Sequence, residues 1–139
     1  MRSRGWIVML AALAAAPAVA QTPVPDLRGT WKGDSQSIVA DTGNPHHPGS
    51  PQSGPRLNST PFTLTIDKQD GRRFSGMFSS PRSTESLIGV LTQNGTVLAV
   101  DSDGYTFGTV LAPNRLEMCY LQISSSGRVA SCTELTKQP

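Results

Sequence analysis

The sequence has little charge, few cysteines and few histidines. Charged residues make up 16% of its 139 residues, and it contains two cysteines and two histidines. It lacks an unbroken apolar run of about 20 residues, the length that a membrane-spanning helix requires. It also lacks the basic stripe that marks a nucleic-acid-binding domain. These absences predict neither a membrane span nor a nucleic-acid partner.

The first twenty residues differ from the rest of the chain. Arg2 and Arg4 precede a short apolar run, which the small residues Ala18-Val19-Ala20 close. A basic start, a short hydrophobic stretch and an A-x-A pattern are typical of a secretory signal peptide; a buried N-terminal helix is the alternative. We therefore predict that residues 1–20 are a signal peptide and that residues 21–139 form one domain, periplasmic or secreted.

Removal of this segment leaves a balanced charge and both cysteines. Twelve basic residues include Arg2 and Arg4, so the other ten match the ten acidic residues. Cys119 and Cys132 form an even pair in a chain expected to reach an oxidising compartment, which favours a disulfide over two buried thiols.

After residue 20, short apolar runs alternate with turn signals about every ten residues, the pattern of antiparallel hairpins. No segment there has a convincing helical period. The pattern predicts an all-β fold, an eight-stranded antiparallel up-and-down barrel, with a β-sandwich as the alternative. The predicted strands are 27–39, 62–67, 73–79, 87–92, 96–100, 105–111, 116–123 and 128–135.

A long connection separates the first two predicted strands. Residues 41–61 contain five prolines and three glycines and have no periodicity, so we predict a flexible loop. It carries His46 and His47, and the topology places it at the same end of the barrel as Asp101 and Asp103. Adjacent histidines in such a loop are not spaced like metal ligands, so we predict no metal and no cofactor.

Two of the predicted hairpins allow more specific predictions. Asn94-Gly95 marks a tight turn, and both faces of the Leu87–Val100 hairpin are apolar. An apolar outer face needs a cover, which indicates self-association. We expect one face to carry Leu87, Leu91, Leu98 and Val100, and the other Ile88, Val90, Val97 and Ala99.

If Cys119 lies opposite Cys132, then Leu121 faces Ala130 and Glu117 faces Glu134. Two facing carboxylates are costly inside an apolar barrel, so we predict that this face points outward. Leu116, Met118 and Tyr120 then point inward.

The predicted interior is rich in aromatic rings: Trp31, Phe62, Phe74, Phe78, Tyr105, Phe107 and Tyr120. An eight-stranded barrel is either filled by its side chains or holds one small ligand. Aromatic walls suit a small apolar or aromatic molecule. The chain lacks a G-x-S-x-G motif, and its thiols are expected to pair, so we predict no enzymatic activity.

Three motifs resemble those of the avidin and lipocalin barrels. Leu27-Arg-Gly-Thr-Trp31 is similar to the L-x-G-x-W opening of avidins and the G-x-W of lipocalins. Residues 73–80, RFSGMFSS, resemble the avidin strand F-T-G-T-Y-T-T, and Thr106-Phe-Gly108 resembles its T-F-G strand. The resemblance implies a ligand-binding barrel. It places Ser37 and Ser80 where avidins bind the biotin ring, with Phe78 in place of a tyrosine.

The same resemblance argues against biotin. Gly33 stands where that family has an asparagine, and the tryptophan beyond the T-F-G strand is missing. We therefore predict a non-enzymatic barrel that binds a small molecule other than biotin. Its candidate ligand-binding residues are Trp31, Ser37, Phe78, Ser80, Tyr105 and Tyr120. The alternative is a protein-binding envelope module, such as a hydrolase inhibitor, acting through residues 21–26 or 41–61.

Overall fold

The computed structural model describes residues 23–41, 46, 54–125 and 127–139. Within them the chain forms eight strands and no helix. The strands are β1 (Gly29–Asp41), β2 (Arg56–Asp70), β3 (Arg73–Ser79), β4 (Thr84–Leu91), β5 (Thr96–Val100), β6 (Tyr105–Ala112), β7 (Arg115–Ser124) and β8 (Gly127–Lys137). The predicted signal peptide, residues 1–20, lies outside the described residues.

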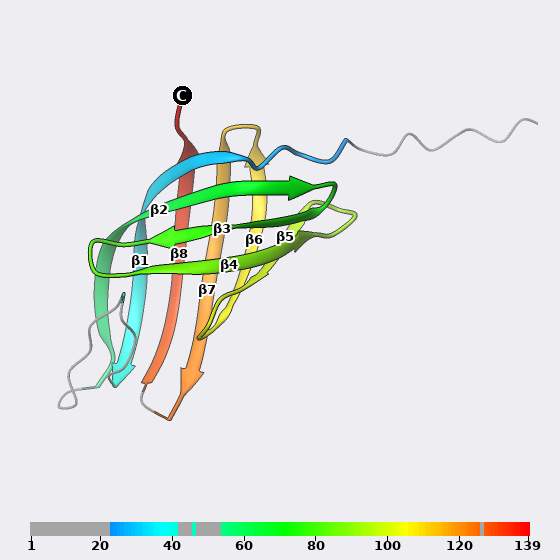
Figure 1. Ribbon diagram of the computed structural model, residues 1–139. Coiled ribbons are helices and arrows are strands. Elements are labelled where there is room, and N and C mark those ends of the chain that lie inside the picture. The colour runs from blue at the N-terminus through cyan, green and yellow to red at the C-terminus, as the bar shows by residue number, and fades with distance from the viewer. Residues whose placement is uncertain (1–22, 42–45, 47–53, 126) are drawn as a thin grey trace, which may run out of the picture.

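The eight strands close into one antiparallel barrel in chain order, and β8 pairs with β1 (Figure 1). The predicted up-and-down barrel is confirmed and the sandwich is excluded. Its architecture is consistent with a calycin-like fold. Among the described residues, no helix has the length and apolarity needed to cross a membrane.

The connection between β1 and β2 is shorter than predicted, because β2 begins at Arg56 rather than near Phe62. We placed the start of this strand after Pro61, because proline cannot donate a hydrogen bond within a sheet. Pro61 lies opposite Asp34 of β1, while β3 pairs with β2 only from Thr63 onward. Residues 56–61 therefore pair on one side only, and a proline is tolerated at such an edge.

One end of the barrel is closed by an apolar core. Leu27 and Trp31 are 1% and 0% exposed, and the indole Nε1 of Trp31 donates a 2.8 Å hydrogen bond to the Leu27 carbonyl. The Gln69 side chain holds the segment before β1, since its Oε1 accepts from Leu27 N and its Nε2 donates to Pro25 O, both at 2.8 Å. These two hydrogen bonds hold residues 25–27 against this end of the barrel.

A salt bridge on the surface accompanies this segment. Arg28 donates side-chain hydrogen bonds to Asp26, and these hold the pKa of that carboxyl well below its usual range. Asp26 is therefore ionised at every pH near neutrality.

The β4–β5 turn differs from the prediction by one residue. Thr92 N donates to Thr96 O at 2.8 Å, and Gly95 has a φ of +84°, so the loop has three residues, Gln93 to Gly95. A two-residue Asn94-Gly95 turn would pair Leu91 with Leu98, whereas Leu91 pairs with Val97.

The face assignment of this hairpin was therefore wrong, because the extra turn residue inverts β5 relative to β4. Both faces are apolar, as predicted, but their members change. Leu87, Leu91, Val97 and Ala99 are buried, and Ile88, Val90, Leu98 and Val100 are exposed.

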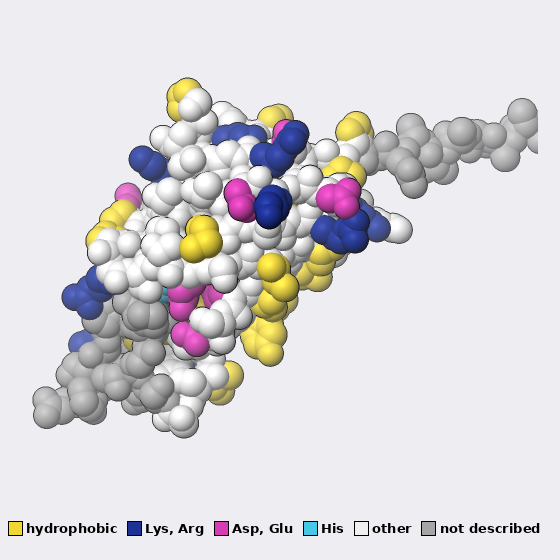
Figure 2. Space-filling view, viewed as in Figure 1, with side chains coloured by type: hydrophobic (Ala, Val, Ile, Leu, Met, Phe, Trp, Pro, Cys, Tyr) yellow, Lys and Arg dark blue, Asp and Glu magenta, His cyan; other side chains and the backbone are white. Residues whose placement is uncertain are grey.

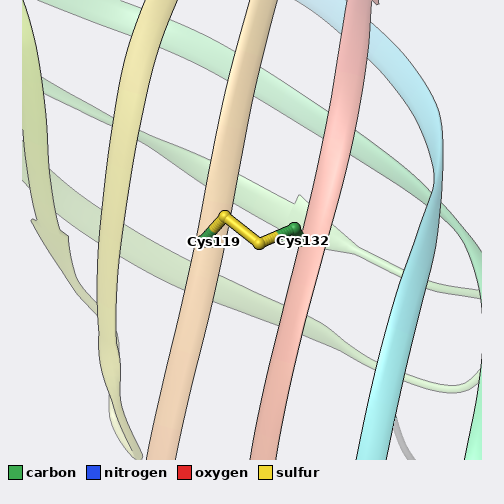
Figure 3. Close-up of a disulfide and its surroundings, with 2 residues drawn as sticks. All are labelled: Cys119 and Cys132. Atoms are coloured by element: carbon green, nitrogen blue, oxygen red, sulfur yellow. A yellow bond between two sulfur atoms is a disulfide. The ribbon is translucent and has the colours of Figure 1, made fainter.

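The disulfide and its register are confirmed. Cys119 and Cys132 are bonded and lie opposite each other on β7 and β8, as Figure 3 shows. Glu117 faces Glu134 on the outer surface, and Arg115 forms an ion pair with Glu134. The bond fits a protein of an oxidising compartment.

The bond should contribute substantially to stability. Its two cysteines are 13 residues apart, and the chain-entropy model assigns about 3 kcal/mol to a loop of this length. Replacing both Cys119 and Cys132 with alanine should lower the free energy of unfolding in urea by about that amount. A loss below about 1 kcal/mol would contradict this account.

Candidate functional site

The connections that follow β1, β3, β5 and β7 leave the barrel at the end opposite the apolar core. Among the described residues they include the turns 80–83 and 101–104. We call this end of the barrel the loop end. The prediction that alternate connections gather there is confirmed by the topology.

Polar side chains line the inside of the barrel at the loop end. They occupy one inward position on each of five neighbouring strands, and each is the cross-strand neighbour of the next. We call this set the inner polar row: Asn58, Ser37, Ser131, Tyr120 and Thr106. Ser35 and Thr133 lie one inward position closer to the core and are also buried. The inside of the loop end is therefore more polar than the other end, although Val39 and Val129, next to the row, are also buried.

Two buried polar atoms in this region lack partners within the part of the chain that the structure describes. They are Ser35 Oγ and Asn58 Nδ2. Leaving such a group unsatisfied costs about 1–3 kcal/mol. An interior that carries two of them favours a bound polar group.

A small cavity lies beside the inner polar row. Its volume is about 20 Å³. It is lined by the apolar side chains of Phe78, Leu87 and Met118 and by Asp101, Thr106, Tyr120, Ser131 and Thr133. A water molecule needs about 10–15 Å³ of such volume. The cavity thus accommodates about one water.

The imidazole of His46 fills the mouth of the barrel above this region. Its Nδ1 lies 2.7 Å from Ser80 Oγ, and its Nε2 lies 3.1 Å from Glu85 Oε2. Its ring packs at 5.4 Å from the ring of Phe62, which stacks on Phe78 at 4.5 Å. His46 is 5% exposed, so these contacts anchor it in the interior.

The hydrogen-bond partners assign the protons of this group. Ser80 Oγ accepts from the backbone N–H groups of Arg82 and Ser83, at 3.2 and 3.3 Å. Both of its acceptor positions are then occupied, and its own proton is directed to His46 Nδ1. The other ring nitrogen, Nε2, then carries the proton and donates to Glu85, whose second oxygen accepts from Ser102 Oγ at 3.1 Å.

A serine, a histidine and a carboxylate in this order also form the relay of serine hydrolases. Here the seryl oxygen already accepts two backbone N–H groups, and the imidazole is almost fully covered. The arrangement fits an anchor that holds His46 between β3 and β4 better than it fits a nucleophile.

The predicted site residues fall into three groups. Ser37, Phe78, Ser80 and Tyr120 lie at the loop end, on the inside or the rim of the barrel. Trp31 lies in the apolar core at the other end. Tyr105 lies on the outer surface and is 63% exposed.

The prediction that Tyr105 and Phe107 point inward was wrong. Gly104, which precedes Tyr105, points inward. Only glycine fits there, because a Cβ atom would lie 2.5 Å from the Tyr120 ring. Thr106 then points inward, and its two aromatic neighbours point outward. Tyr120, which was also predicted to point inward, does so.

Sequence reasoning missed Ser35, Asn58 and Glu85, and it did not foresee the partners of His46. Glu85 lies 39 residues from His46 in the chain, and no local pattern joins them. Among the described residues, no three His, Cys, Asp or Glu side chains gather in a way that would hold a metal ion. His47 lies outside the described residues.

Comparisons of the sequence with protein-family models and with curated proteins find no match.

Proposed function

We propose that the protein is an exported, non-enzymatic binding protein that holds one small polar molecule inside the loop end of its barrel. The observation that carries this proposal is the inner polar row, together with the buried, unpartnered Ser35 Oγ and Asn58 Nδ2. A barrel that only needed to be stable would fill this volume with apolar side chains, as the opposite end does.

The lining changes the ligand class expected from the sequence. Aromatic walls predicted an apolar or aromatic guest, but Tyr105 and Phe107 lie outside the barrel. The side chains that remain combine the hydroxyl and amide groups of the inner polar row with Phe78, Leu87 and Met118 at the cavity. They suit a small molecule that has hydrogen-bond donors and acceptors and also an apolar part. The stacked pair of Phe62 and Phe78 offers one apolar surface beside them.

The likeness to avidins and lipocalins supports a ligand-binding role. The two positions carried over from avidins, Ser37 and Ser80, both lie at the loop end. A biotin site is disfavoured, because a Cβ atom at Gly33 would lie 2.0 Å from the Glu134 carbonyl oxygen. This strand has no room for the asparagine that the family uses there.

His46 controls how large the ligand can be. With its imidazole on Ser80 and Glu85, the cavity accommodates about one water. A larger ligand displaces the imidazole. It then forms hydrogen bonds with the two groups that the imidazole had bound, the Ser80 hydroxyl and the Glu85 carboxylate.

The alternative, a protein-binding module such as a hydrolase inhibitor, has less support. It required residues 21–26 or 41–61 to protrude. Pro25 and Leu27 are instead fastened across the closed end by Gln69, and residues 56–61 belong to β2. The remainder of those segments lies largely outside the described residues.

Export to the periplasm or the medium is part of the proposal. The predicted signal peptide and the Cys119–Cys132 bond support it.

A substitution that fills the loop end should abolish binding. Ser131 is 8% exposed, belongs to the inner polar row and lines the cavity. In Ser131→Leu, the added apolar carbons occupy the ligand volume and remove a hydroxyl partner. Protein purified from its own host should release a small molecule on denaturation, detected by mass spectrometry, and Ser131→Leu should release none.

Thr136→Leu is the matched control, because Thr136 lies on the outside of the same strand. It should release the same molecule as the wild type in the same amount. The proposal is wrong if wild-type protein carries nothing and no small polar compound raises its melting temperature. Equal release from Ser131→Leu would place the ligand elsewhere.

A further inference from the structure

The outside of the barrel at the loop end is apolar. Directly beside the inner polar row runs a second set of cross-strand neighbours that point outward, one position along each strand. We call it the outer apolar row: Leu57, Ile38, Ala130, Leu121, Tyr105, Val100 and Ile88. The outside of this half therefore carries more apolar side chains than the outside of a soluble barrel usually does, while Val39 and Val129 stay buried inside it.

The apolar surface is densest over β4, β5 and β6. Here the exposed side chains surround a groove of about 590 Å³, whose lining includes Ile88, Val90, Leu98, Val100, Tyr105 and Phe107. Figure 2 shows hydrophobic side chains gathered along this edge of the barrel, where β5 and β6 lie in Figure 1.

Projecting apolar side chains lie next to this groove. Leu121 and Ile123 on β7 are 48% and 80% exposed, and Leu121 is the cross-strand neighbour of Tyr105. The same face therefore presents a groove on one side of Tyr105 and protruding side chains on the other.

The apolar area of this face fits the apolar part of an interface. The groove residues with Leu121 and Ile123 are 39–80% exposed. Fully exposed, an aromatic side chain offers about 150–250 Å² and an aliphatic one roughly 60–120 Å², so the eight expose on the order of 500 Å². The largest apolar patch of a typical monomer is about 300–600 Å². A standard interface buries about 800 Å² on each partner, and about 65% of a homodimer interface is apolar.

We propose that two copies of this chain associate through this face about a twofold axis that passes near Tyr105. A twofold interface brings the same patch of both copies together. The axis then places Leu121 and Ile123 of each copy in the groove of the other. A flat lipid surface fits a concave face less well than a partner with protruding side chains. Since every residue involved points outward, this proposal is independent of the ligand.

Sedimentation velocity of the purified protein tests the oligomer. The wild type should sediment as a dimer in the micromolar range. Ile88→Asp places a carboxylate in the groove and should raise the dimer dissociation constant at least about 30-fold, the effect of a central interface residue. Met77→Asp is the matched control, because Met77 is 41% exposed on the outside of β3, away from the groove. It should leave the dimer intact.

A crosslink tests the axis. A cysteine close to a twofold axis meets its own symmetry mate, so Tyr105→Cys should form a disulfide-linked dimer under mild oxidation. Lys32→Cys, exposed on β1, should not. Unchanged circular dichroism of each variant would verify the fold.

Several results would overturn the proposal. The proposal is wrong if the wild-type protein is a monomer at micromolar concentration. It is also wrong in that case if this face instead binds lipid vesicles or a different protein. A dimer that Met77→Asp dissociates and Ile88→Asp does not would also overturn it.

Discussion

Gly33→Ala should destabilise the barrel by about 3 kcal/mol or more. Gly33 lies on β1, where β1 meets β8 and the barrel closes. A Cβ atom at this position would lie 2.0 Å from the Glu134 carbonyl oxygen and 3.3 Å from the Leu135 Cα. Both contacts are to backbone, which cannot rotate away as a side chain can. One methyl group therefore has to separate the two strands that close the sheet.

Urea unfolding followed by circular dichroism measures this effect, and Lys32→Ala is the matched control. Lys32 is the preceding residue and is exposed, so its substitution should change the free energy of unfolding by no more than about 0.5 kcal/mol. If Gly33→Ala is as mild as Lys32→Ala, the close approach of β1 and β8 is not a feature of the protein.

Trp31→Ala should cost about 3–5 kcal/mol, the range for removing a large buried aromatic side chain. Trp31 is 0% exposed and packs at the closed end, and its Nε1 donates to the Leu27 carbonyl. The substitution leaves a cavity and frees Leu27, which is itself 1% exposed. The same urea titration measures the loss.

Trp31→Phe tests whether the closed end belongs to the binding site. It keeps one aromatic ring in the core and removes the indole N–H and the second ring, so it should cost less than Trp31→Ala. Because Trp31 is remote from the inner polar row, Trp31→Phe should retain the bound molecule. Loss of the molecule from this folded variant would mean that the binding site includes the closed end.

Much of the fold follows from local signals in the sequence. Turn residues such as Asp70-Gly71 and Asp103-Gly104 separate the strands at the predicted places. The two cysteines gave the correct register for the last hairpin, because a cross-strand disulfide requires that its residues face each other. These predictions succeeded because each depends on neighbouring residues or on one covalent constraint.

The direction of the side chains could not be predicted in the same way. Strict alternation indicates which residues share a face, but it does not say which face is inside. Assigning the aromatic residues to the interior failed for Tyr105, since the Tyr120 ring occupies the space beside Gly104. At the loop end the general expectation that apolar residues point inward holds for Val39 and Val129 but fails for Ile38, Leu57 and Ile123.

The candidate site was predicted only in part. Ser37, Phe78, Ser80 and Tyr120 lie at the loop end, but the partners of His46 depend on contacts between residues 34 and 39 positions apart in the chain. Such contacts exist only after the barrel has closed, and a single sequence carries no local sign of them.

The two proposals rest on neighbouring parts of the barrel. The inner polar row runs over β2, β1, β8, β7 and β6, and the groove of the proposed dimer face is centred on β4, β5 and β6. Unpartnered polar groups inside and exposed apolar side chains outside each cost stability in an isolated, empty barrel. On our proposals a polar ligand offsets the first cost and a second copy of the chain offsets the second, so the two can fail separately.

The central claim is that the loop end holds a polar guest, and a high-resolution crystal structure of protein purified from its own host tests it most directly. We expect electron density for a small molecule within hydrogen-bonding distance of Ser35 Oγ or Asn58 Nδ2, with His46 displaced from Ser80. An interior that holds only water or no density, with His46 still on Ser80 and Glu85, would contradict the account.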